Sequence, residues 1–391
     1  MKKLILILAV VGVAIAGYFY YSPKADNNLA DSPKNATYII GDKPVTLVDG
    51  KFEEEIAPGA ASKRIVMAFN EPVYGDLDGD ADDDALMLIT DDSGGSGTFY
   101  YAVVAVNDGG KYKGTNAILL GDRIAPQTTE MRTGVAIANY ADRAPGEPMT
   151  ARPSIGKSAY MTLGNGKLKE IAPLSKGEQV LFGYLTIGHE ARSFRPCGEG
   201  QPEYWLSGDS PALDKLKKTY ADEVSDVEPA AYAPLFAVVA GKIVAAPEDG
   251  FGADYDYALR VSEFVRADRE GSCKSDLVVA SSPLAGSTIT SPLTVEGFAR
   301  GLWYFEASFP IILTDWDGKI IAEHYATAEE DPATGEVNWM TEKFVPFKGV
   351  IEFKKPESAN GFSKRGTLIL KKDNPSGLSE HDDALEIPVY F

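Results

Sequence analysis

Short apolar runs separated by turn residues recur along the whole chain and predict a mostly β protein. Runs rich in Val, Ile, Leu and aromatic residues, about four to eight residues long, alternate with clusters of Gly, Pro, Asn and Asp, as in antiparallel strands joined by tight turns. Residues 93–97 (SGGSG) lie between two apolar runs and predict a hairpin. A second hairpin is predicted by the apolar runs 235–239 and 242–245, which lie on either side of Gly241. Asp317-Gly318 predicts a third, with a type I′ turn.

One segment has the period of an amphipathic helix. Ser210 is a favourable N-cap residue, and Pro211 suits the first helical position. Leu213, Leu216 and Tyr220 then recur on one helical face. The pattern therefore predicts a single helix over residues 210–223, within an otherwise β-rich region.

The expected elements group into three modules behind an N-terminal segment. The first module spans residues 37–163, the second 171–273 and the third 279–391, and residues 22–36 form a polar tether before them. A length of 391 residues suits two or three domains. In the third module the strands follow one another without an intervening helix, which predicts an antiparallel β-sandwich.

Residues 1–21 are interpreted as a targeting segment. Two lysines precede an apolar run over residues 4–21, which is close to the lower limit of about 17 residues for a spanning helix. Aromatic residues at 18–21 are typical of a membrane interface and favour a retained single anchor. The small residues at 14–16 also fit the cleavage site of a signal peptide. Both alternatives place the body outside the cytoplasm, either on the outer side of the cytoplasmic membrane or secreted.

The charge of the chain excludes two classes of partner. With 57 acidic and 38 basic residues, the formal net charge is -19. Nucleic-acid binding needs a basic footprint against the phosphates, so we expect no nucleic-acid partner. The same acidity disfavours adhesion to anionic lipid surfaces.

An aspartate-rich run in the first module is the strongest candidate site. Six aspartates lie within nine residues: Asp76, Asp78, Asp80, Asp82, Asp83 and Asp84. Apolar runs at residues 65–69 and 85–89 frame the segment, and carboxylates so close to a core repel one another unless a cation lies among them. Calcium takes about 6–8 oxygen ligands, many of them from carboxylates. We therefore predict a structural Ca2+ site whose ligands are Asp76, Asp78, Asp80 and Asp84; a solvated acidic loop is the alternative.

The spacing rules out a helix-flanked EF-hand. If Asp76 is the first loop position, Ala81 occupies the sixth, where Gly is required. Met87 occupies the twelfth, where a bidentate Glu is required. Strands are also expected on both sides, so the ion would tie two strands together rather than act as a sensor.

The only two cysteines are Cys197 and Cys273. In an exported protein an even pair is more often a disulfide than a metal site; two buried free thiols are the alternative. A bridge between these cysteines closes a long loop and would stabilise its module by about 4–5 kcal/mol on the chain-entropy relation.

The sequence gives no catalytic signature. Gly-x-Ser-x-Gly, Gly-x-x-x-x-Gly-Lys and His-Glu-x-x-His motifs are all missing. The three histidines, His189, His324 and His381, are scattered. A polar site near His189 and a second cation site near His381 are weaker alternatives. We expect a protein that is not an enzyme.

The third module resembles the immunoglobulin-like domain of bacterial spore-germination proteins, the Gmad2 family. The similar segments are residues 291–297 (SPLTVEG), 303–310 (WYFEASFP), 313–318 (LTDWDG) and 366–370 (GTLIL). This resemblance implies an immunoglobulin-like β-sandwich at the cell surface, with a binding or spacer role. It does not imply germination itself.

The second module looks like the C-terminal OB-type barrel of the envelope lipoprotein NlpE, through residues 183–187, 191–197 and 213–220. The resemblance implies a small OB-like barrel with one helix and a bridge between Cys197 and Cys273. The CxxC of that family's other domain is missing, so metal sensing does not carry over.

The first module resembles extracytoplasmic domains with an FG-GAP/VCBS-like aspartate loop. The similar segments are residues 75–80 (GDLDGD), 93–99 and 119–123. The loop occurs once, and a propeller needs several blades, so this resemblance implies a β-rich domain without a propeller.

These observations together predict a non-catalytic protein of the bacterial cell envelope, either membrane-tethered or secreted, that binds, senses or scaffolds. Its partner would be an envelope protein or a polysaccharide, and neither the ligand nor the oligomeric state follows from the sequence. A hydrolase of cell-wall or other polysaccharide is one alternative. A redox or stress sensor that uses Cys197 and Cys273 is another.

Overall fold

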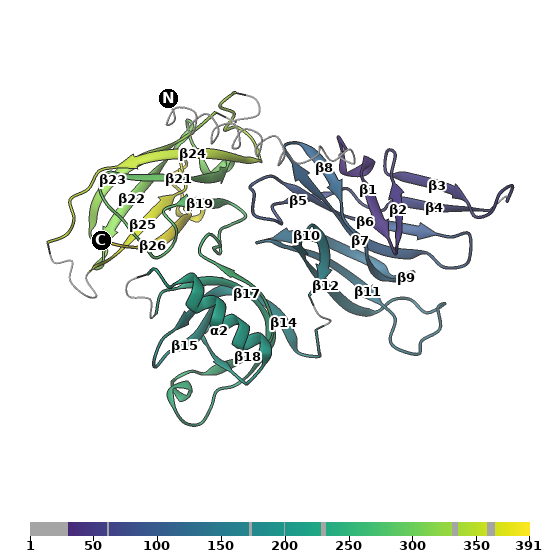
Figure 1. Cartoon of the computed structure of the whole chain (residues 1–391), viewed down its shortest axis with the longest axis horizontal. Helices are drawn as coiled ribbons and strands as arrows, with labels where there is room; N and C mark the ends of the chain where they lie inside the picture. The colour runs from purple at the N-terminus through teal and green to yellow at the C-terminus, as the bar shows by residue number, and fades with distance from the viewer. Residues whose placement is uncertain are drawn as a thin grey trace, which may run out of the picture.

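The computed structural model describes residues 30–60, 62–171, 174–198, 200–227, 232–330, 335–357 and 364–391. These residues form three β-rich modules that pack against one another (Figure 1). The prediction of a mainly β, multi-domain fold is confirmed. The predicted anchor at residues 1–21 and the part of the predicted tether before Ala30 lie outside the described residues. Among the helices that are described, none has both the length and the apolar character needed to cross a membrane.

The first module consists of three sheets. Its strands are β1 (Thr37–Ile40), β2 (Lys43–Thr46), β3 (Lys51–Glu55), β4 (Lys63–Ala68), β5 (Val73–Gly75), β6 (Asp84–Asp92), β7 (Phe99–Asp108), β8 (Lys111–Gly114), β9 (Ile118–Asp122), β10 (Ala125–Arg132), β11 (Val135–Asp142), β12 (Ile155–Gly164) and β13 (Lys167–Glu170). One sheet has the order β3-β4-β6-β7-β8, with β5 on β6 and β9 on β7. A second sheet has the order β10-β11-β12-β13, and β1 pairs with β2.

Strand β6 is buried on both of its faces. Leu86 and Leu88 belong to the core shared with the β10–β13 sheet. Met87 and Ile89 belong to the core beneath β1 and β2. Because successive side chains of a strand point to opposite faces, a strand covered on both sides is apolar at every position. This burial explains the uninterrupted apolar run that follows the aspartates.

Residues 30–36, which were predicted to belong to the polar tether 22–36, are hydrogen-bonded into the first module. Ala30 and Tyr112 exchange two backbone hydrogen bonds of 2.8 Å. A short 3-10 helix follows at Pro33–Asn35, and Ala36 is fully buried. At the other end of the module, the β12–β13 hairpin continues to Glu170, past the expected limit at residue 163.

The second module is a closed five-stranded barrel. Its elements are β14 (Glu178–Ile187), β15 (Arg192–Pro196), β16 (Tyr204–Ser207), α2 (Pro211–Glu223), β17 (Leu235–Ala245), the 3-10 helix Phe251–Asp254 and β18 (Tyr257–Asp268). The strand order is β14-β15-β16-β18-β17, and β16 and β18 are parallel. A small five-stranded barrel with one helix agrees with the OB-like expectation.

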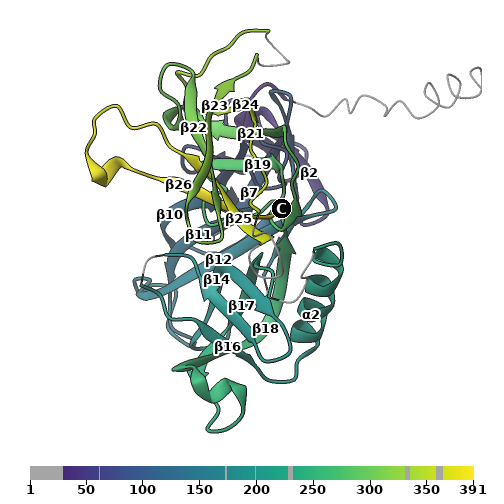
Figure 2. The ribbon, with the colours of Figure 1, turned by 90° about the vertical axis from the view of Figure 1, so that its left-hand side faces the viewer.

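Helix α2 has the sequence signals that predict it. The Ser210 hydroxyl accepts a hydrogen bond from the Leu213 N–H at 3.1 Å, as an N-cap does. Leu213, Leu216 and Tyr220 are the buried residues of the helix. They join the barrel core, so the helix closes one side of the barrel (Figure 2).

Gly241 lies inside a strand rather than in a turn, which corrects the hairpin expected there. Strand β17 runs without interruption through this position, and its pairing with β18 shifts register between Ala240 and Gly241. A Cβ at Gly241 would lie 2.5 Å from the Arg260 carbonyl oxygen. Glycine here therefore permits a close backbone approach at a bulge, the other common reason for glycine in a strand.

The third module is an immunoglobulin-like sandwich. Its elements are β19 (Val278–Ser282), β20 (Ser287–Thr288), β21 (Leu293–Arg300), the 3-10 helix Gly301–Trp303, β22 (Ser308–Asp315), β23 (Ile320–Ala328), β24 (Phe344–Ile351), β25 (Arg365–Lys371), the 3-10 helix Ser379–His381 and β26 (Ala384–Tyr390). The pairing order is β19-β21-β24-β23-β22-β25-β26-β20. Only two residue pairs join β23 to β24, and residues of both halves, including the fully buried Trp303, form one core.

The turn between β22 and β23 differs from the type I′ turn expected for it. The Gly318 N–H donates to the Asp315 carbonyl at 3.1 Å, and Gly318 has φ +77°. Asp317 is not among the described residues with positive φ, whereas a type I′ turn requires positive φ at both central residues. The hairpin itself is confirmed, but the left-handed glycine is the fourth residue of its turn rather than one of the two central residues.

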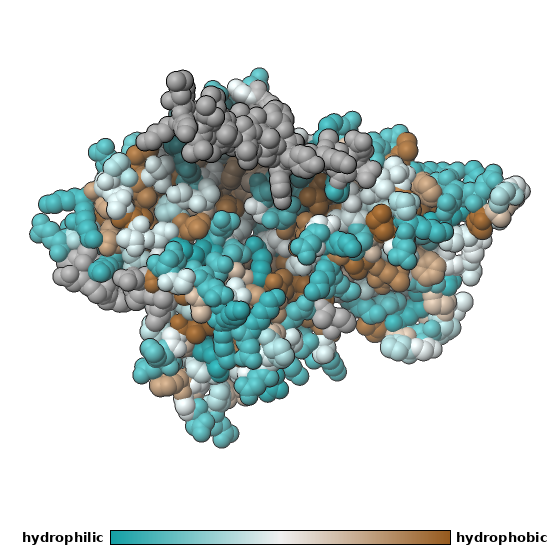
Figure 3. Space-filling view, in the orientation of Figure 1, coloured by the Kyte–Doolittle hydropathy of each residue, from teal (hydrophilic) through white to brown (hydrophobic). Residues whose placement is uncertain are grey.

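The three modules are joined by shared cores. Val135 and Ile137 of the first module pack in one cluster with Phe182 and Phe236 of the barrel. Tyr390 of the third module belongs to the barrel core. In the space-filling view, hydrophilic side chains cover much of the surface and hydrophobic ones form separate patches (Figure 3). Shared burial of this kind holds the modules as one body.

Candidate functional site: the aspartate loop at the module junction

The aspartate run forms the connection between two paired strands. Gly75 at the end of β5 pairs with Asp84 at the start of β6, so residues 76–83 form the loop of a hairpin. A Cβ at Gly75 would lie 2.6 Å from the Met131 Cβ. Glycine at this position therefore lets β5 lie against β10, which brings the loop to the edge of the second sheet.

The loop gathers three of the four predicted calcium ligands. Carboxylate oxygens of Asp76, Asp78 and Asp84 all lie within 4.8 Å of one another, and across the described parts of the chain this is the group suited to hold a metal ion. Asp80 falls outside the group. Its Oδ1 accepts a hydrogen bond from the Asp82 N–H at 2.8 Å instead.

Backbone donors hold Asp76 in place. Its Oδ1 accepts from the Gly79 N–H at 2.6 Å, and its Oδ2 accepts from the Ala81 N–H at 3.0 Å. Gly79 and Ala81 both have positive φ, of 90° and 69°, so the loop turns back sharply around this side chain. Each carboxylate oxygen has two lone pairs, and Asp76 therefore keeps acceptor capacity for a cation.

Asp84 is fully buried at the base of the loop. Its Oδ2 accepts from the Leu77 N–H at 2.9 Å, and its Oδ1 accepts from the Asn107 N–H at 2.8 Å. The first bond closes the loop, and the second fixes it to β7. Asp84 therefore has a structural role besides any role as a ligand.

Burial and mutual repulsion work against negative charge in this loop. Burial, together with the charges of Asp78 and Asp76, raises the pKa of Asp84 to about 7. Burial likewise raises the pKa of Asp80 to about 6, again with a contribution from Asp78. The pKa of Asp76 is raised by burial as well. A bound divalent cation reverses such shifts because it stabilises the charged carboxylates, and the donor set of carboxylate oxygens suits calcium.

A neighbouring aspartate connects the loop to the third module. Asp83 accepts two hydrogen bonds from Arg300, at 2.7 and 2.8 Å, and each side chain is only 14% exposed. Arg300 also donates to the carbonyls of Asp276 and Glu342, both at 3.1 Å. Its guanidinium lies 4.1 Å from the centre of the Phe344 ring. This pairing joins residues 217 positions apart, and no local pattern in the sequence indicates it.

The turn between β10 and β11 forms the second part of this junction. The Thr133 N–H donates to Asp276 Oδ1 at 2.7 Å, and the Thr133 carbonyl accepts from Arg266 Nη2 at 3.1 Å. Arg266 belongs to the barrel, whereas Asp276 lies between the barrel and β19. One turn of the first module is thus held by the barrel and by the segment that links the barrel to the third module. Gly134 is the sequence signal that marks this turn, because glycine readily takes the positive φ found there.

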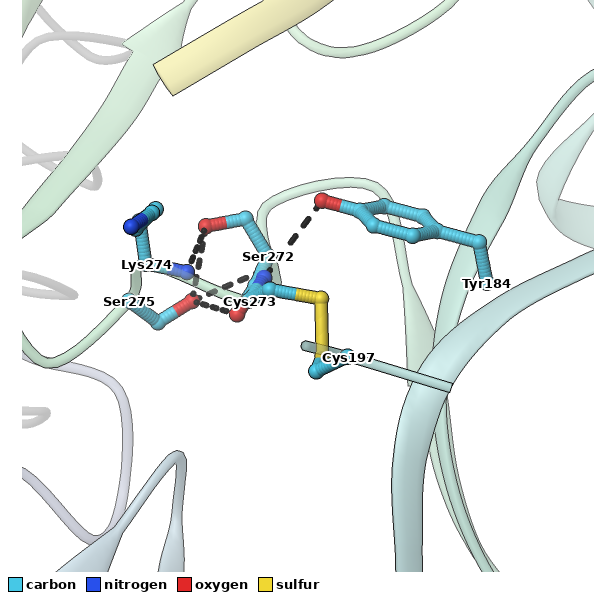
Figure 4. Close-up of a disulfide and its surroundings, with 6 residues drawn as sticks. All are labelled: Tyr184, Cys197, Ser272, Cys273, Lys274 and Ser275. Carbon is cyan, nitrogen blue, oxygen red and sulfur yellow. Dashed lines mark hydrogen bonds between the residues drawn. A yellow bond between two sulfur atoms is a disulfide. The ribbon is translucent and has the colours of Figure 1, made fainter. Parts of the chain in front are cut away.

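The predicted disulfide is present. Cys197 and Cys273 are bonded, with 5.5 Å between their Cα atoms and a sequence separation of 76 residues. Figure 4 shows the bridge beside Tyr184, whose hydroxyl accepts from the Cys273 N–H at 3.4 Å. The Cys197 N–H donates to the Phe182 carbonyl at 2.7 Å. The bridge fastens the end of the barrel region to its beginning, and the alternative of two free thiols is wrong.

The three histidines lie apart from the aspartate cluster in the part of the chain that the structure describes. His189, His324 and His381 belong to no group of metal-ligating side chains in the described ranges. His324 Nδ1 accepts a hydrogen bond from the Tyr325 N–H at 2.7 Å, which is a local contact in β23. The weaker alternative of a second cation site near His381 therefore stays a prediction, without a clustered group of ligands around it in the described ranges.

Comparison with known proteins identifies one of the modules. Residues 277–368 match the family described as the immunoglobulin-like domain of bacterial spore germination, Gmad2. This match covers most of the third module and confirms the resemblance drawn from its motifs. No curated protein and no solved structure matches the chain.

The third module is thus an immunoglobulin-like domain of an extracytoplasmic, binding type. The intact disulfide is consistent with an envelope or secreted location, because such bonds persist in oxidising compartments.

Proposed function

We propose that this chain is a non-catalytic protein of the bacterial cell envelope whose three modules act as one binding or scaffolding body. The observation that carries the proposal is the Gmad2 domain at residues 277–368. It is joined to the other modules by a largely buried ion pair and by a shared core. A domain fixed in this way presents its surface in one orientation, which suits a binding or scaffolding role more than a flexible spacer role.

A short membrane tether fits this function. The apolar run at residues 4–21 supports a single N-terminal anchor. Because Ala30 is already hydrogen-bonded into the first module, only residues 22–29 separate the run from the folded body. Eight extended residues span about 26–29 Å at most. An anchored body would therefore stay close to the outer face of the cytoplasmic membrane, and N-terminal sequencing of the mature protein tests whether the anchor is kept.

Calcium in the aspartate loop would stabilise the junction between modules. Asp76, Asp78 and Asp84 would supply part of the oxygen shell, and carbonyls or water the remainder. Such an ion would be structural: it would neutralise the loop and hold Asp83 in position to pair with Arg300.

Two single variants separate a calcium site from a solvated acidic loop. Asp78→Asn replaces a carboxylate of the clustered group with a neutral amide. Asp80→Asn makes the same change of charge at an aspartate outside the group. Calorimetric titration of Ca2+ should show binding by wild type and by Asp80→Asn, and much weaker binding by Asp78→Asn. Equal behaviour of the two variants, or no binding by wild type, rejects the assignment.

The alternative of a cell-wall hydrolase is tested by a zymogram with cell-wall substrates beside a sugar-array screen. We expect saturable binding without a cleared band, and turnover would reject the non-catalytic assignment. The alternative of a redox sensor requires the Cys197–Cys273 bridge to open. A reactive-thiol assay on protein from native envelopes should find no reduced pair, whereas a reducible pair would favour the sensor.

A further inference from the structure

A cavity of about 570 Å³ lies at the boundary between the first module and the barrel. Its walls include the aspartate loop, the β12–β13 hairpin and parts of β7, β8 and β18. Sites for small molecules have volumes of about 300–1,000 Å³ and occur preferentially between domains. The cavity therefore has both the size and the position of a ligand site.

The β12–β13 hairpin presents three polar side chains to this cavity. Thr162, Asn165 and Lys167 all line it, and within the described residues none of the three has a side-chain hydrogen bond or an ion pair. A hydroxyl and an amide each donate and accept hydrogen bonds, whereas an ammonium only donates. The hairpin therefore offers a ligand both donors and acceptors that no protein group occupies.

The backbone that carries these side chains is held in place. Asn165 and Gly166 have φ of 53° and 69°, and a type I′ turn requires positive φ at both central residues. The Asn116 side chain bonds both the N–H and the carbonyl of Leu168, each at 2.9 Å, which fixes β13 beside the segment before β9. A site on such a framework loses little free energy to ordering when it binds a ligand.

The charges around the cavity favour a ligand without net charge. Arg266 also lines it but is paired with Asp268 at 3.0 Å, and Lys113 has an interaction partner of its own. Asp78 and Lys167 are the remaining charged lining residues, and their signs are opposite. An anion would meet the carboxylate and a cation would meet the ammonium, whereas a neutral polar ligand can bond to both.

Aliphatic side chains form the rest of the wall. Leu77, Val106, Leu163 and Val265 line the cavity, and transfer of C–H surface from water to such side chains is favourable. A ligand that matches this wall carries several hydroxyls, presents C–H faces and has no net charge. These properties together define a neutral saccharide.

We propose that this cavity binds a short neutral saccharide, with hydroxyls at Thr162, Asn165 and Lys167 and a C–H face against Leu77 and Leu163. Glycans built from N-acetylated sugars have this chemistry, because their acetamido groups are uncharged. The inference rests on the proposed binding role and deepens it by giving the ligand class and the place where it binds.

The probe for this site is di-N-acetylchitobiose, a neutral dimer of N-acetylglucosamine. It is titrated into the full chain in a polyoxyethylene detergent, which contains no sugar, and binding is followed by ligand-observed NMR. Wild type should bind it saturably and equally well at low and high salt, since salt screens interactions between charges. Thr162→Val/Lys167→Met should weaken binding by about tenfold or more, because loss of one hydrogen bond changes an equilibrium constant by about two- to tenfold.

Thr327→Val/Lys169→Met is the matched control, since it makes the same two changes at exposed residues of β23 and β13 that do not line the cavity. Its affinity should equal that of wild type. Asn165→Gly is a second test that preserves the fold, because glycine accepts the positive φ of the turn, and it should weaken binding by about two- to tenfold.

Three results would each overturn the assignment: no saturable binding by wild type, binding that falls as salt rises, or unchanged affinity of both cavity variants. Melting temperatures of the variants show that any loss of binding is not a loss of folding. If the chain binds isolated cell walls but not the saccharide, only the cavity assignment falls. If it binds neither, the proposed binding role falls with it.

Discussion

The pair formed by Asp83 and Arg300 is the contact through which the aspartate loop reaches the third module, and Arg300→Gln tests its importance. In wild type the guanidinium makes two short hydrogen bonds to the carboxylate, and both side chains are 14% exposed. The substitution leaves a largely buried carboxylate without its cation. It also removes the two bonds to backbone carbonyls and the contact with the Phe344 ring.

The expected loss of stability follows from this burial. Removal of one partner from a buried ion pair costs about 3–5 kcal/mol. Because both side chains keep some exposure, we expect Arg300→Gln to lower the free energy of unfolding by about 3 kcal/mol. Asp83→Asn should cost less, because Arg300 keeps its carbonyl partners. The double variant should be little worse than Arg300→Gln alone, which gives a coupling energy of about 2 kcal/mol for directly contacting residues.

Urea unfolding of the disulfide-intact protein, followed by tryptophan fluorescence and far-ultraviolet circular dichroism, measures these free energies, provided the two transitions coincide. Lys348→Gln is the matched control. Lys348 pairs with Glu296 of the same strand as Arg300, but those side chains are 46% and 41% exposed. Loss of an exposed pair costs about 0–1 kcal/mol. Equal losses for Arg300→Gln and Lys348→Gln, or fully additive effects in the double variant, would refute the role assigned to the junction.

Three further variants or treatments test other parts of the structure. Removal of calcium with a chelator should lower the melting temperature of the protein, since ion at about 100 times its Kd adds about 2.7 kcal/mol; equal melting with and without chelator counts against the clamp. Cys197→Ser/Cys273→Ser should lower the free energy of unfolding by about 4–5 kcal/mol because the bridge closes a loop of 76 residues, and a loss below about 1 kcal/mol in urea would contradict this. Gly241→Val should cost about 1–3 kcal/mol, as overpacking does, since its Cβ would lie 2.5 Å from a carbonyl of β18; wild-type stability would show that the strand can move apart.

Local signals in the sequence predicted the local structure well. The cap at Ser210 and the apolar face of α2 are confirmed, because capping and helical period act within a few residues. The disulfide is confirmed. Its pairing was predictable because a chain with two cysteines has only one pairing to make. The immunoglobulin-like fold of the third module was predicted from motifs that it shares with a known family, and not from the alternation of apolar and polar residues alone.

Features that depend on the path of the chain in space were not predicted. The prediction that Asp76, Asp78 and Asp80 face one ion holds only if the loop is extended, because alternate residues then point to the same side of the chain. The left-handed residues Gly79 and Ala81 turn the chain, so Asp80 is separated from the clustered carboxylates. The Asp83–Arg300 pair joins distant segments, and Gly241 was misread because glycine marks both turns and close approaches of strands.

Binding without turnover is tested most directly in one sample of purified bacterial cell walls incubated with the full chain. Retained protein is measured by sedimentation, and released fragments are measured by reducing ends and free amino groups over time. The proposed function predicts saturable retention with fragment release no greater than in walls alone. Release that grows with time and with protein concentration would contradict it and establish the hydrolase instead.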